Sequence, residues 1–207
     1  MKGLLLKEFL LLKKNLIWYV LVFLFFGIMG IFAPEVSTFI PMFMSIAICG
    51  NINDDDKSKW SLYSQSLPLE RKIHVKAQYN ATFIFSAIAT IFTALIYVIS
   101  TIVTFNQFDI RQLFTLCAVS VVISLVPISV YIPFTYKFSS ENGRNILIII
   151  YFGLMFFAPT TFLLDFIDWN LGDPPAVSTS LIAMAVIIAV FLLSWFISVK
   201  IYEKKDI

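Results

Sequence analysis

Long apolar stretches recur along the whole chain and constrain its fold more than any other feature. A helix that crosses the hydrocarbon core of a bilayer needs about 20 mostly apolar residues. Stretches of this kind occupy residues 16–33, 36–52, 79–105, 113–135, 146–164 and 177–199. The composition agrees, because 59% of the residues are hydrophobic and 14% are charged, whereas soluble domains are about 25% charged. The sequence therefore predicts an all-α integral membrane protein, a single domain over residues 1–207 with six transmembrane helices.

The second stretch is the weakest of the six. It is the shortest, and Pro41 lies near its start. Proline removes a backbone hydrogen-bond donor and disturbs a helix. The alternative is therefore a tilted or partly re-entrant second helix, which would leave five spans or a hairpin at the first pair.

Basic residues are distributed unevenly between the segments that separate the apolar stretches. If the N-terminus is cytoplasmic, Arg111 lies outside, and 14 of the 15 basic residues lie inside. These 14 are Lys2, Lys7, Lys13, Lys14, Lys57, Lys59, Arg71, Lys72, Lys76, Lys137, Arg144, Lys200, Lys204 and Lys205. Because cytoplasmic segments of membrane proteins carry an excess of lysine and arginine, both termini are predicted to be cytoplasmic.

Residues 2–14 are predicted to form a short helix before the first span. The four lysines fall within one arc of this helix, and apolar residues fall within the opposite arc. Glu8 interrupts the apolar arc, and Leu6 and Leu10 interrupt the basic one. Basic amphipathic helices lie between lipid headgroups and acyl chains. We therefore predict an interfacial helix on the inner leaflet, with a plain cytoplasmic extension of the first span as the alternative.

The longest segment between spans is the predicted cytoplasmic loop 51–78. Asn53 is a favourable N-cap, and three aspartates would follow in the first turn of a helix, where carboxylates favour the helix dipole. Trp60, Tyr63 and Leu67 would form one aromatic face of that helix, and Pro68 would end it. The residues of this predicted helix and its exit are Asp54, Asp55, Asp56, Lys57, Lys59, Trp60, Tyr63, Leu67, Pro68 and Arg71.

Two roles fit the aromatic face of this predicted helix. Trp60 and Tyr63 are typical of anchors in the headgroup region. An aromatic face flanked by both signs of charge is more typical of a protein interface, so we favour docking of a cytoplasmic protein. A metal site is not expected, because three consecutive aspartates point in different directions around a helix and a calcium loop would need Gly in place of Asp56.

Several kinds of chemistry have no basis in the sequence. No G-x-x-x-x-G-K-[ST] motif is present, so the chain is not expected to bind nucleotide phosphates by a P-loop. No ionisable residue lies well inside a predicted span, which disfavours a proton-coupled carrier, an intramembrane protease and a charge-lined channel. The serine and threonine hydroxyls within the predicted spans are predicted to form hydrogen bonds between helices. We expect neither an enzyme nor a bound cofactor or metal.

Two short motifs before the third span carry a resemblance to a known family. The first reads D-x-x-x-W-x-x-Y and comprises Asp56, Trp60 and Tyr63. The second reads S-L-P-x-x-R from Ser66 to Arg71. Together with the opening MKGLLLKEFLLLKKN and the six-span arrangement, they resemble the small permease subunits of bacterial type-2 ABC exporters. The resemblance covers the chain by architecture, although its specific residues are confined to a small part of it.

This resemblance implies a site, partners and a location. The first loop would be a coupling helix in a groove of a separate ATPase subunit, which would itself bind ATP and Mg²⁺. Two permeases, identical or different, would pair in the bacterial cytoplasmic membrane. Nucleic acid is not expected as a partner. A smaller second contact with the ATPase would comprise Ser139, Ser140, Glu141, Asn142 and Arg144.

The resemblance also suggests a substrate class. Small size, short external loops and Phe-rich spans look most like permeases that export amphipathic peptides, for instance the staphylococcal phenol-soluble modulin exporters. The residues that bind substrate and the direction of transport stay open at this point. One rival is a membrane accessory or immunity protein that sequesters a toxin without transport. A secondary carrier is the other.

Overall fold

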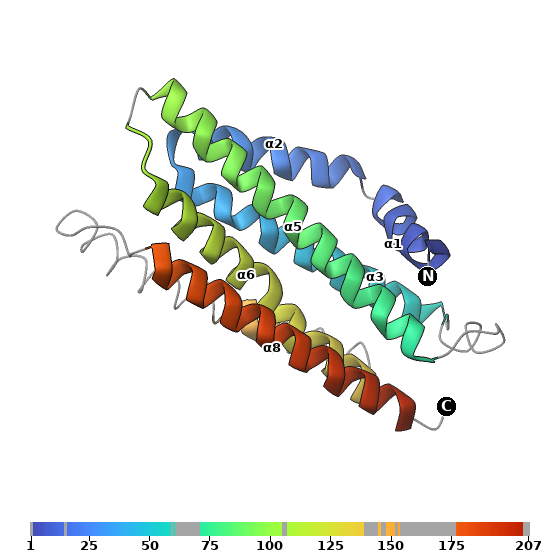
Figure 1. Cartoon of the computed structure of the whole chain (residues 1–207). Coiled ribbons are helices and arrows are strands. Elements are labelled where there is room, and N and C mark those ends of the chain that lie inside the picture. The colour runs from blue at the N-terminus through green and yellow to red at the C-terminus, as the bar shows by residue number, and fades with distance from the viewer. Residues whose placement is uncertain are drawn as a thin grey trace.

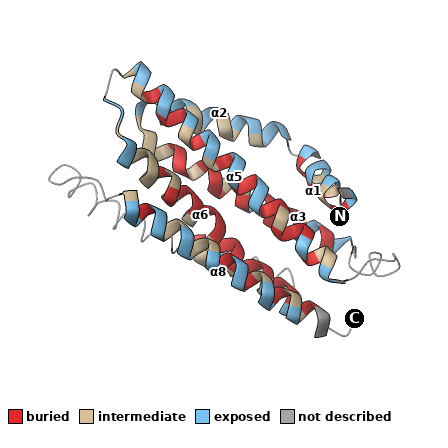
Figure 2. Cartoon of the chain, viewed as in Figure 1, coloured by how far each residue is buried: buried red, intermediate tan, exposed pale blue. Residues whose placement is uncertain are grey.

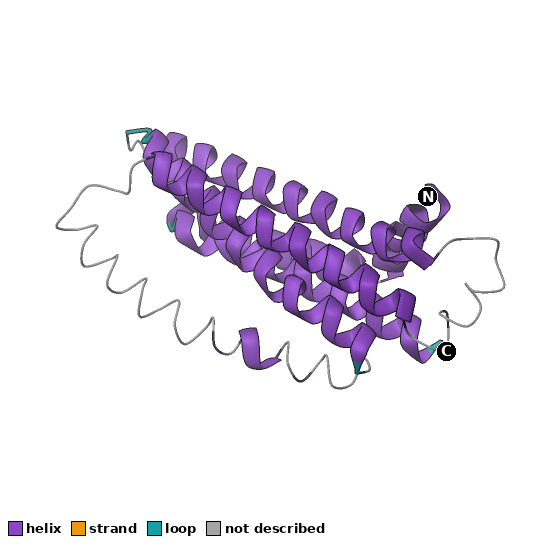
Figure 3. Cartoon of the chain, turned by 60° about the horizontal axis from the view of Figure 1, so that its bottom comes forward, coloured by secondary structure: helices purple, strands orange, loops and turns teal. Residues whose placement is uncertain are grey.

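A computed structural model describes residues 2–14, 16–58, 60, 71–104, 107–138, 145, 148–151, 153 and 177–204. These residues form helices and contain no strand, as Figure 3 shows. The elements in chain order are α1 (Lys2–Lys14), α2 (Leu16–Phe32), the 3-10 helix η1 (Pro34–Phe39), α3 (Ile40–Lys57), α5 (Arg71–Val103), α6 (Ile110–Lys137) and α8 (Val177–Lys204). The predicted all-α class is confirmed for the part of the chain that the structure describes.

The long helices lie side by side in one bundle (Figure 1). Helix α6 packs against α3, α5 and α8, and its Tyr131, Leu125, Ile128 and Ile132 are almost completely buried. Figure 2 shows buried residues along the inward sides of α3, α5 and α6. Helix α2 is different, because Gly30 is the one buried residue among its 17.

The outer surface of the bundle is apolar. Ile17 and Phe32 in α2 are each 75% exposed, and Ile102 of α5 and Phe196 of α8 are also largely exposed. Soluble monomers rarely expose continuous apolar surface over several helices. Acyl chains solvate such a surface at no cost, so the exposed side chains of α2, α5 and α8 are those of a membrane protein.

Four described stretches are long and apolar enough to cross a membrane: Pro34–Asp55, Lys72–Val103, Ile110–Lys137 and Val177–Tyr202. The pair formed by α1 and α2, which meet at 72°, brings the number to five if it is one broken span. The predicted span at 146–164 lies largely outside the described residues. The count of six therefore stays a prediction.

Pro41 does not break the second span. It occupies the first turn of α3, directly after η1, where its missing N–H would have no helical partner in any case. Pro127 and Pro133 lie inside α6, which nevertheless continues from Ile110 to Lys137. Neighbouring helices in a membrane protein allow such prolines to be tolerated.

Basic residues gather at one end of the bundle, together with Glu8 and the three aspartates of α3. Helix α1 begins and α8 finishes at this end (Figure 1), where α3 and α6 also finish and α5 begins. Lys57, Lys72, Lys137 and Lys200 lie near this end, whereas Glu35, Asp109 and Arg111 belong to segments at the other. The bundle thus has one strongly basic end.

A close contact at Gly30 fixes α2 to the rest of the bundle. A Cβ atom at this position would lie 2.9 Å from Ile96 Cγ2 and 2.9 Å from Ser37 Cβ. Hydrogen bonds surround the contact, with Thr93 donating to the Ser37 carbonyl over 3.2 Å and Ser100 to the Ile31 carbonyl over 2.7 Å. Glycine therefore allows α2, η1 and α5 to approach one another.

Gly30→Ala should lower the free energy of unfolding by about 1–3 kcal/mol, because the added methyl group overpacks this contact. Gly27→Ala is the matched control, since its Cβ would meet Ile96 at an ordinary 3.9 Å. That change should be neutral or stabilising by up to about 1 kcal/mol, because alanine favours the helix. Thermal unfolding in detergent micelles measures both, and equal effects of the two changes would contradict the assignment.

Candidate functional site

The helices extend into the predicted loop 51–78 from both sides. Helix α3 continues to Lys57, and α5 already begins at Arg71. The prediction that a new helix starts at Asn53 is therefore wrong. The Ser58 N–H donates to the Asp54 carbonyl over 3.0 Å, so the helical hydrogen bonds run through the expected cap. Burial of Ile48 and Ile52 in the core overrides the local preference of Asn and Asp for a helix start.

Three aspartates consequently lie at the C-terminal end of a helix, where the dipole disfavours negative charge. Lys7 of α1 compensates for one of them. Its Nζ forms a short ion pair with Asp55 Oδ2 and lies 3.6 Å from Glu8 Oε1. Asp55 is buried between α1 and α3.

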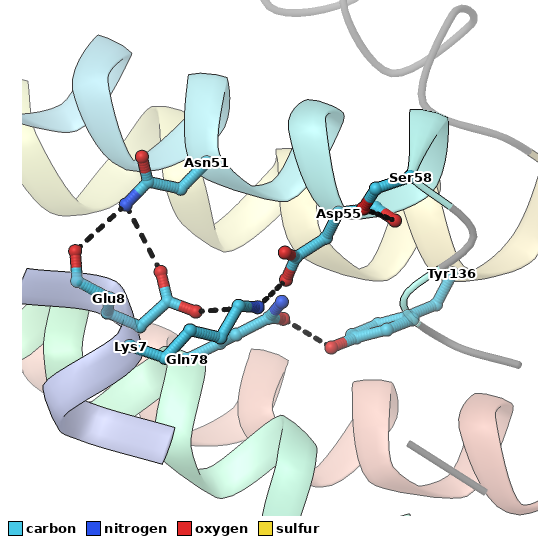
Figure 4. Close-up of polar contacts among 7 residues, drawn as sticks. All are labelled: Lys7, Glu8, Asn51, Asp55, Ser58, Gln78 and Tyr136. Carbon is cyan, nitrogen blue, oxygen red and sulfur yellow. Dashed lines mark hydrogen bonds and ion pairs between the residues drawn. The ribbon is translucent and has the colours of Figure 1, made fainter. Parts of the chain in front are cut away.

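Asn51 adds a second link between the same two helices. Its Nδ2 donates to the Glu8 carbonyl over 3.3 Å and to Glu8 Oε2 over 3.2 Å. Asn51 and Asp55 are four residues apart and share one face of α3. Figure 4 shows this face turned toward Lys7 and Glu8, with Gln78 and Tyr136 nearby. We refer to Lys7, Glu8, Asn51 and Asp55 as the α1–α3 polar cluster.

Trp60 lies at the edge of the polar cluster. The Lys7 ammonium is 4.6 Å from the centre of its ring, which is within the range of a cation–π interaction. Lys7 thus contacts the carboxylates of Glu8 and Asp55 and the ring of Trp60. Its side chain is 20% exposed, and those of Glu8 and Asp55 are 5% and 11% exposed.

The faces of α1 differ from those that the sequence predicted. Leu4, Glu8 and Leu12 point into the bundle and Lys7 is half-buried, whereas Leu6 and Leu10 are more than half exposed. The predicted basic arc is therefore wrong at Lys7. The physical reason is that lipid, unlike water, solvates apolar side chains on the outer face of α1 at no cost. The polar side chains of Lys7 and Glu8 can therefore lie on its inner face. The predicted helix over residues 2–14 itself is confirmed.

Hydroxyl groups join the helices deeper in the bundle. Ser86 and Ser124 lie 2.5 Å apart between α5 and α6, and Ser45 donates to the Ser124 carbonyl over 2.9 Å. Tyr79 joins α5 to α8 through Ser194 at 2.8 Å and Ser198 at 2.7 Å. The prediction that intramembrane hydroxyls bond between helices is confirmed for Ser86 and Ser124. These hydrogen bonds hold α3, α5, α6 and α8 of one chain together.

Nearly the whole chain matches a known protein family. The model of the ABC-2 family transporter proteins matches residues 3–203. The chain belongs to the ABC-2 family. It is thus the membrane permease component of an ABC transporter, and its family membership implies association with an ABC ATPase. Comparison with curated proteins and with solved structures found no match.

Few of the predicted coupling residues of this ABC-2 permease are described in full. Asp54 and Lys57 are exposed, and Trp60 is half-buried. Arg71 is the first residue of α5, and Asp56 belongs to the last turn of α3. Lys59, Tyr63, Leu67 and Pro68 lie outside the described residues, as do all five residues of the predicted second contact: Ser139, Ser140, Glu141, Asn142 and Arg144.

The sequence did not identify the other half of the site. Lys7, Glu8 and Asn51 of the ABC-2 permease were not predicted to meet Asp55, although the sequence contains a signal for two of them. Glu8 is a lone carboxylate in an apolar arc, and Asn51 is a polar residue at the end of an apolar stretch. Such residues in membrane proteins find polar partners. The sequence does not indicate which residues those partners are.

Proposed function

We propose that this ABC-2 permease forms half of an ATP-driven export pathway, and that a separate ATPase subunit docks at the basic end of its bundle. The observation that carries the proposal is the family match over residues 3–203. The chain lacks a P-loop motif, so ATP and Mg²⁺ would be bound by the ATPase subunit.

The arrangement of the helix ends supports docking at this end. Helix α3 finishes, α5 begins and α6 finishes at the basic end of the bundle (Figure 1). The predicted coupling loop 51–78 and the predicted second contact at residues 139–144 therefore both follow helices that finish at this end. The positive-inside rule assigns this end to the cytoplasm, where ATP is available. Trp60, Tyr63 and the preceding aspartates would form the main contact, and residues 139–144 the smaller one.

The mechanism that we propose places all of the phosphate chemistry in the partner. ATP binding closes two ATPase subunits, their movement shifts the segment around Trp60, and the bundle opens a path toward the outside. Two permeases would line that path together. The buried hydroxyls support this arrangement, because Ser86, Ser124 and Tyr79 are bonded within one chain and the apolar outer faces are left to meet a second bundle.

The surfaces of the bundle favour an amphipathic substrate. Helices α2 and α8 expose mainly Leu, Ile, Val and Phe, and no predicted span carries a charge that would bind an ion. An amphipathic peptide could move along such surfaces with its apolar side protected. We therefore propose an amphipathic peptide as the substrate class and an export direction.

Purification of the permease from its native host tests the assignment. An ABC ATPase should co-purify with the permease in mild detergent. Vesicles that contain the complex should move a fluorescent amphipathic helical peptide only when ATP is present. Absence of an ATPase from the purified complex would contradict the proposal.

The same vesicles separate the rivals. An accessory or immunity protein would hold the peptide equally well beside an ATPase whose hydrolysis has been inactivated. A secondary carrier would move it along an ion gradient without ATP. The ABC-2 match favours neither, and either outcome would replace the proposed export function.

A further inference from the structure

Lys7 connects two parts of the chain that are far apart in sequence. Asp55 is 48 residues away at the end of α3, and Trp60 lies beyond that end. The proposed ATPase site begins at these two residues, whereas Lys7 belongs to α1, the first helix. A single ammonium group therefore joins the N-terminal helix to the start of the proposed docking segment.

Lys7 provides the charged link between α1 and the last turn of α3, and Asn51 adds a hydrogen-bonded link one turn earlier through Glu8. Glu8 and Asp55 are both carboxylates, and Asn51 donates to Glu8 alone. Without the Lys7 charge, two largely buried carboxylates would be left beside each other. Removal of one partner from a buried charge pair is strongly unfavourable, so α1 and the end of α3 are held in one relative position.

Helix α1 also packs on α5, where the ring centres of Phe9 and Phe85 lie 4.7 Å apart, but it does not continue straight into α2. It meets α2 at 72°, so the two do not form one straight rod. The neighbouring α2 is the least buried of the long helices, with Gly30 as its one buried residue. Leu6 and Leu10 of α1 face outward, which lets α1 slide against lipid without losing protein contacts on that side.

We propose that Lys7 is a positioning residue that makes α1 move together with the coupling segment during the ATP cycle. When the ATPase shifts the segment around Trp60, Lys7 transfers that shift through Asp55 to α1 and from there to α2. This inference rests on the proposed docking of an ATPase at Trp60. A purely structural role for Lys7 would stabilise the resting bundle without linking the two movements.

Hydrogen–deuterium exchange of the permease–ATPase complex in lipid nanodiscs tests the link. ATP with vanadate should change the exchange of residues 3–13 and of residues 50–57 together. In Lys7→Met, the change at 50–57 should persist while the change at 3–13 is lost. ATP-dependent movement of the fluorescent amphipathic peptide should fall at least about tenfold relative to ATP hydrolysis, within the range of typical coupling between sites.

Matched variants separate the link from general effects of charge. Lys13→Met removes an exposed lysine from the same helix and should behave like the wild type. The double variant Lys7→Asp with Asp55→Lys swaps the two charges. It should restore the simultaneous change in deuterium exchange at residues 3–13 and 50–57. If Lys7→Met alone does not fold, this exchanged pair still tests the link, because a failure to restore the joint change in a folded complex overturns it.

The outcomes distinguish this inference from the proposed function. If ATPase binds and residues 50–57 respond to ATP but residues 3–13 of the wild type do not, the role of Lys7 is refuted and the export proposal stands. The role of Lys7 is also refuted if residues 3–13 and 50–57 still change together in Lys7→Met. If no ATPase binds at all, the proposed function fails first.

Discussion

Trp60→Asp is expected to reduce the amount of ATPase that co-purifies with the permease by at least about tenfold, the loss typical of an aromatic anchor at the centre of an interface. The change removes the ring that contacts Lys7 at 4.6 Å. It also replaces a large aromatic side chain by a small charged one, which cannot fill an apolar pocket of a partner protein.

Three comparisons make this result specific. Trp18→Ala removes a tryptophan that is 70% exposed on α2 and should leave ATPase binding unchanged. Trp60→Phe keeps an aromatic ring and should retain more ATPase than Trp60→Asp. Tyr63→Asp should weaken binding as well if the predicted aromatic face is correct. Wild-type recovery of the ATPase by a folded Trp60→Asp permease would show that the docking segment lies elsewhere.

Hydropathy locates the described spans well because lipid imposes a simple demand on the sequence. Every residue along about 30 Å of helix must tolerate hydrocarbon, so the spans are continuous apolar runs. The run at 113–135 corresponds to α6 (Ile110–Lys137), and the run at 177–199 to α8 (Val177–Lys204). The helices exceed the runs by a few residues at several ends, because polar residues continue a helix outside the hydrocarbon.

The candidate site could be predicted only in part, and the reason lies at the end of α3. Local preferences assigned Asn53 to a helix start, whereas α3 runs through it to Lys57. Burial of Ile52 in the core and the ion pair of Asp55 with Lys7 decide that position, and Lys7 is 48 residues away from Asp55. Periodicity within one segment contains no information about such partners. The contact between α1 and α3 is therefore visible only in three dimensions.

The Asn51–Glu8 contact should respond asymmetrically to the removal of its two partners. Asn51→Leu leaves the Glu8 carboxylate, which is 5% exposed, without its amide donor. The free energy of unfolding should fall by about 2–3 kcal/mol, the cost of a buried charged group that loses its hydrogen bond. Urea or thermal unfolding in detergent micelles, followed by circular dichroism, measures the change.

Glu8→Leu should cost within about 1 kcal/mol, because Lys7 keeps Asp55 as its partner and no buried charge is left unpaired. The change leaves Lys7 and Asp55 as a balanced pair, and Asn51 keeps its bond to the carbonyl of residue 8. Asn51→Leu should then cost far less in the Glu8→Leu background than in the wild type. Equal costs in the two backgrounds would show that the carboxylate is not what Asn51 stabilises.

Asn53→Leu completes this comparison two positions further along α3. If Asn53 were an N-cap, as local sequence suggests, its loss would cost about 1 kcal/mol. Because the residue lies inside a continuous helix from Ile40 to Lys57, leucine should instead be neutral or slightly stabilising through its higher helix propensity. A loss for Asn51→Leu without one for Asn53→Leu would show that Asn51 stabilises the bundle through its contact with Glu8 of α1, in a helix that runs through Asn53.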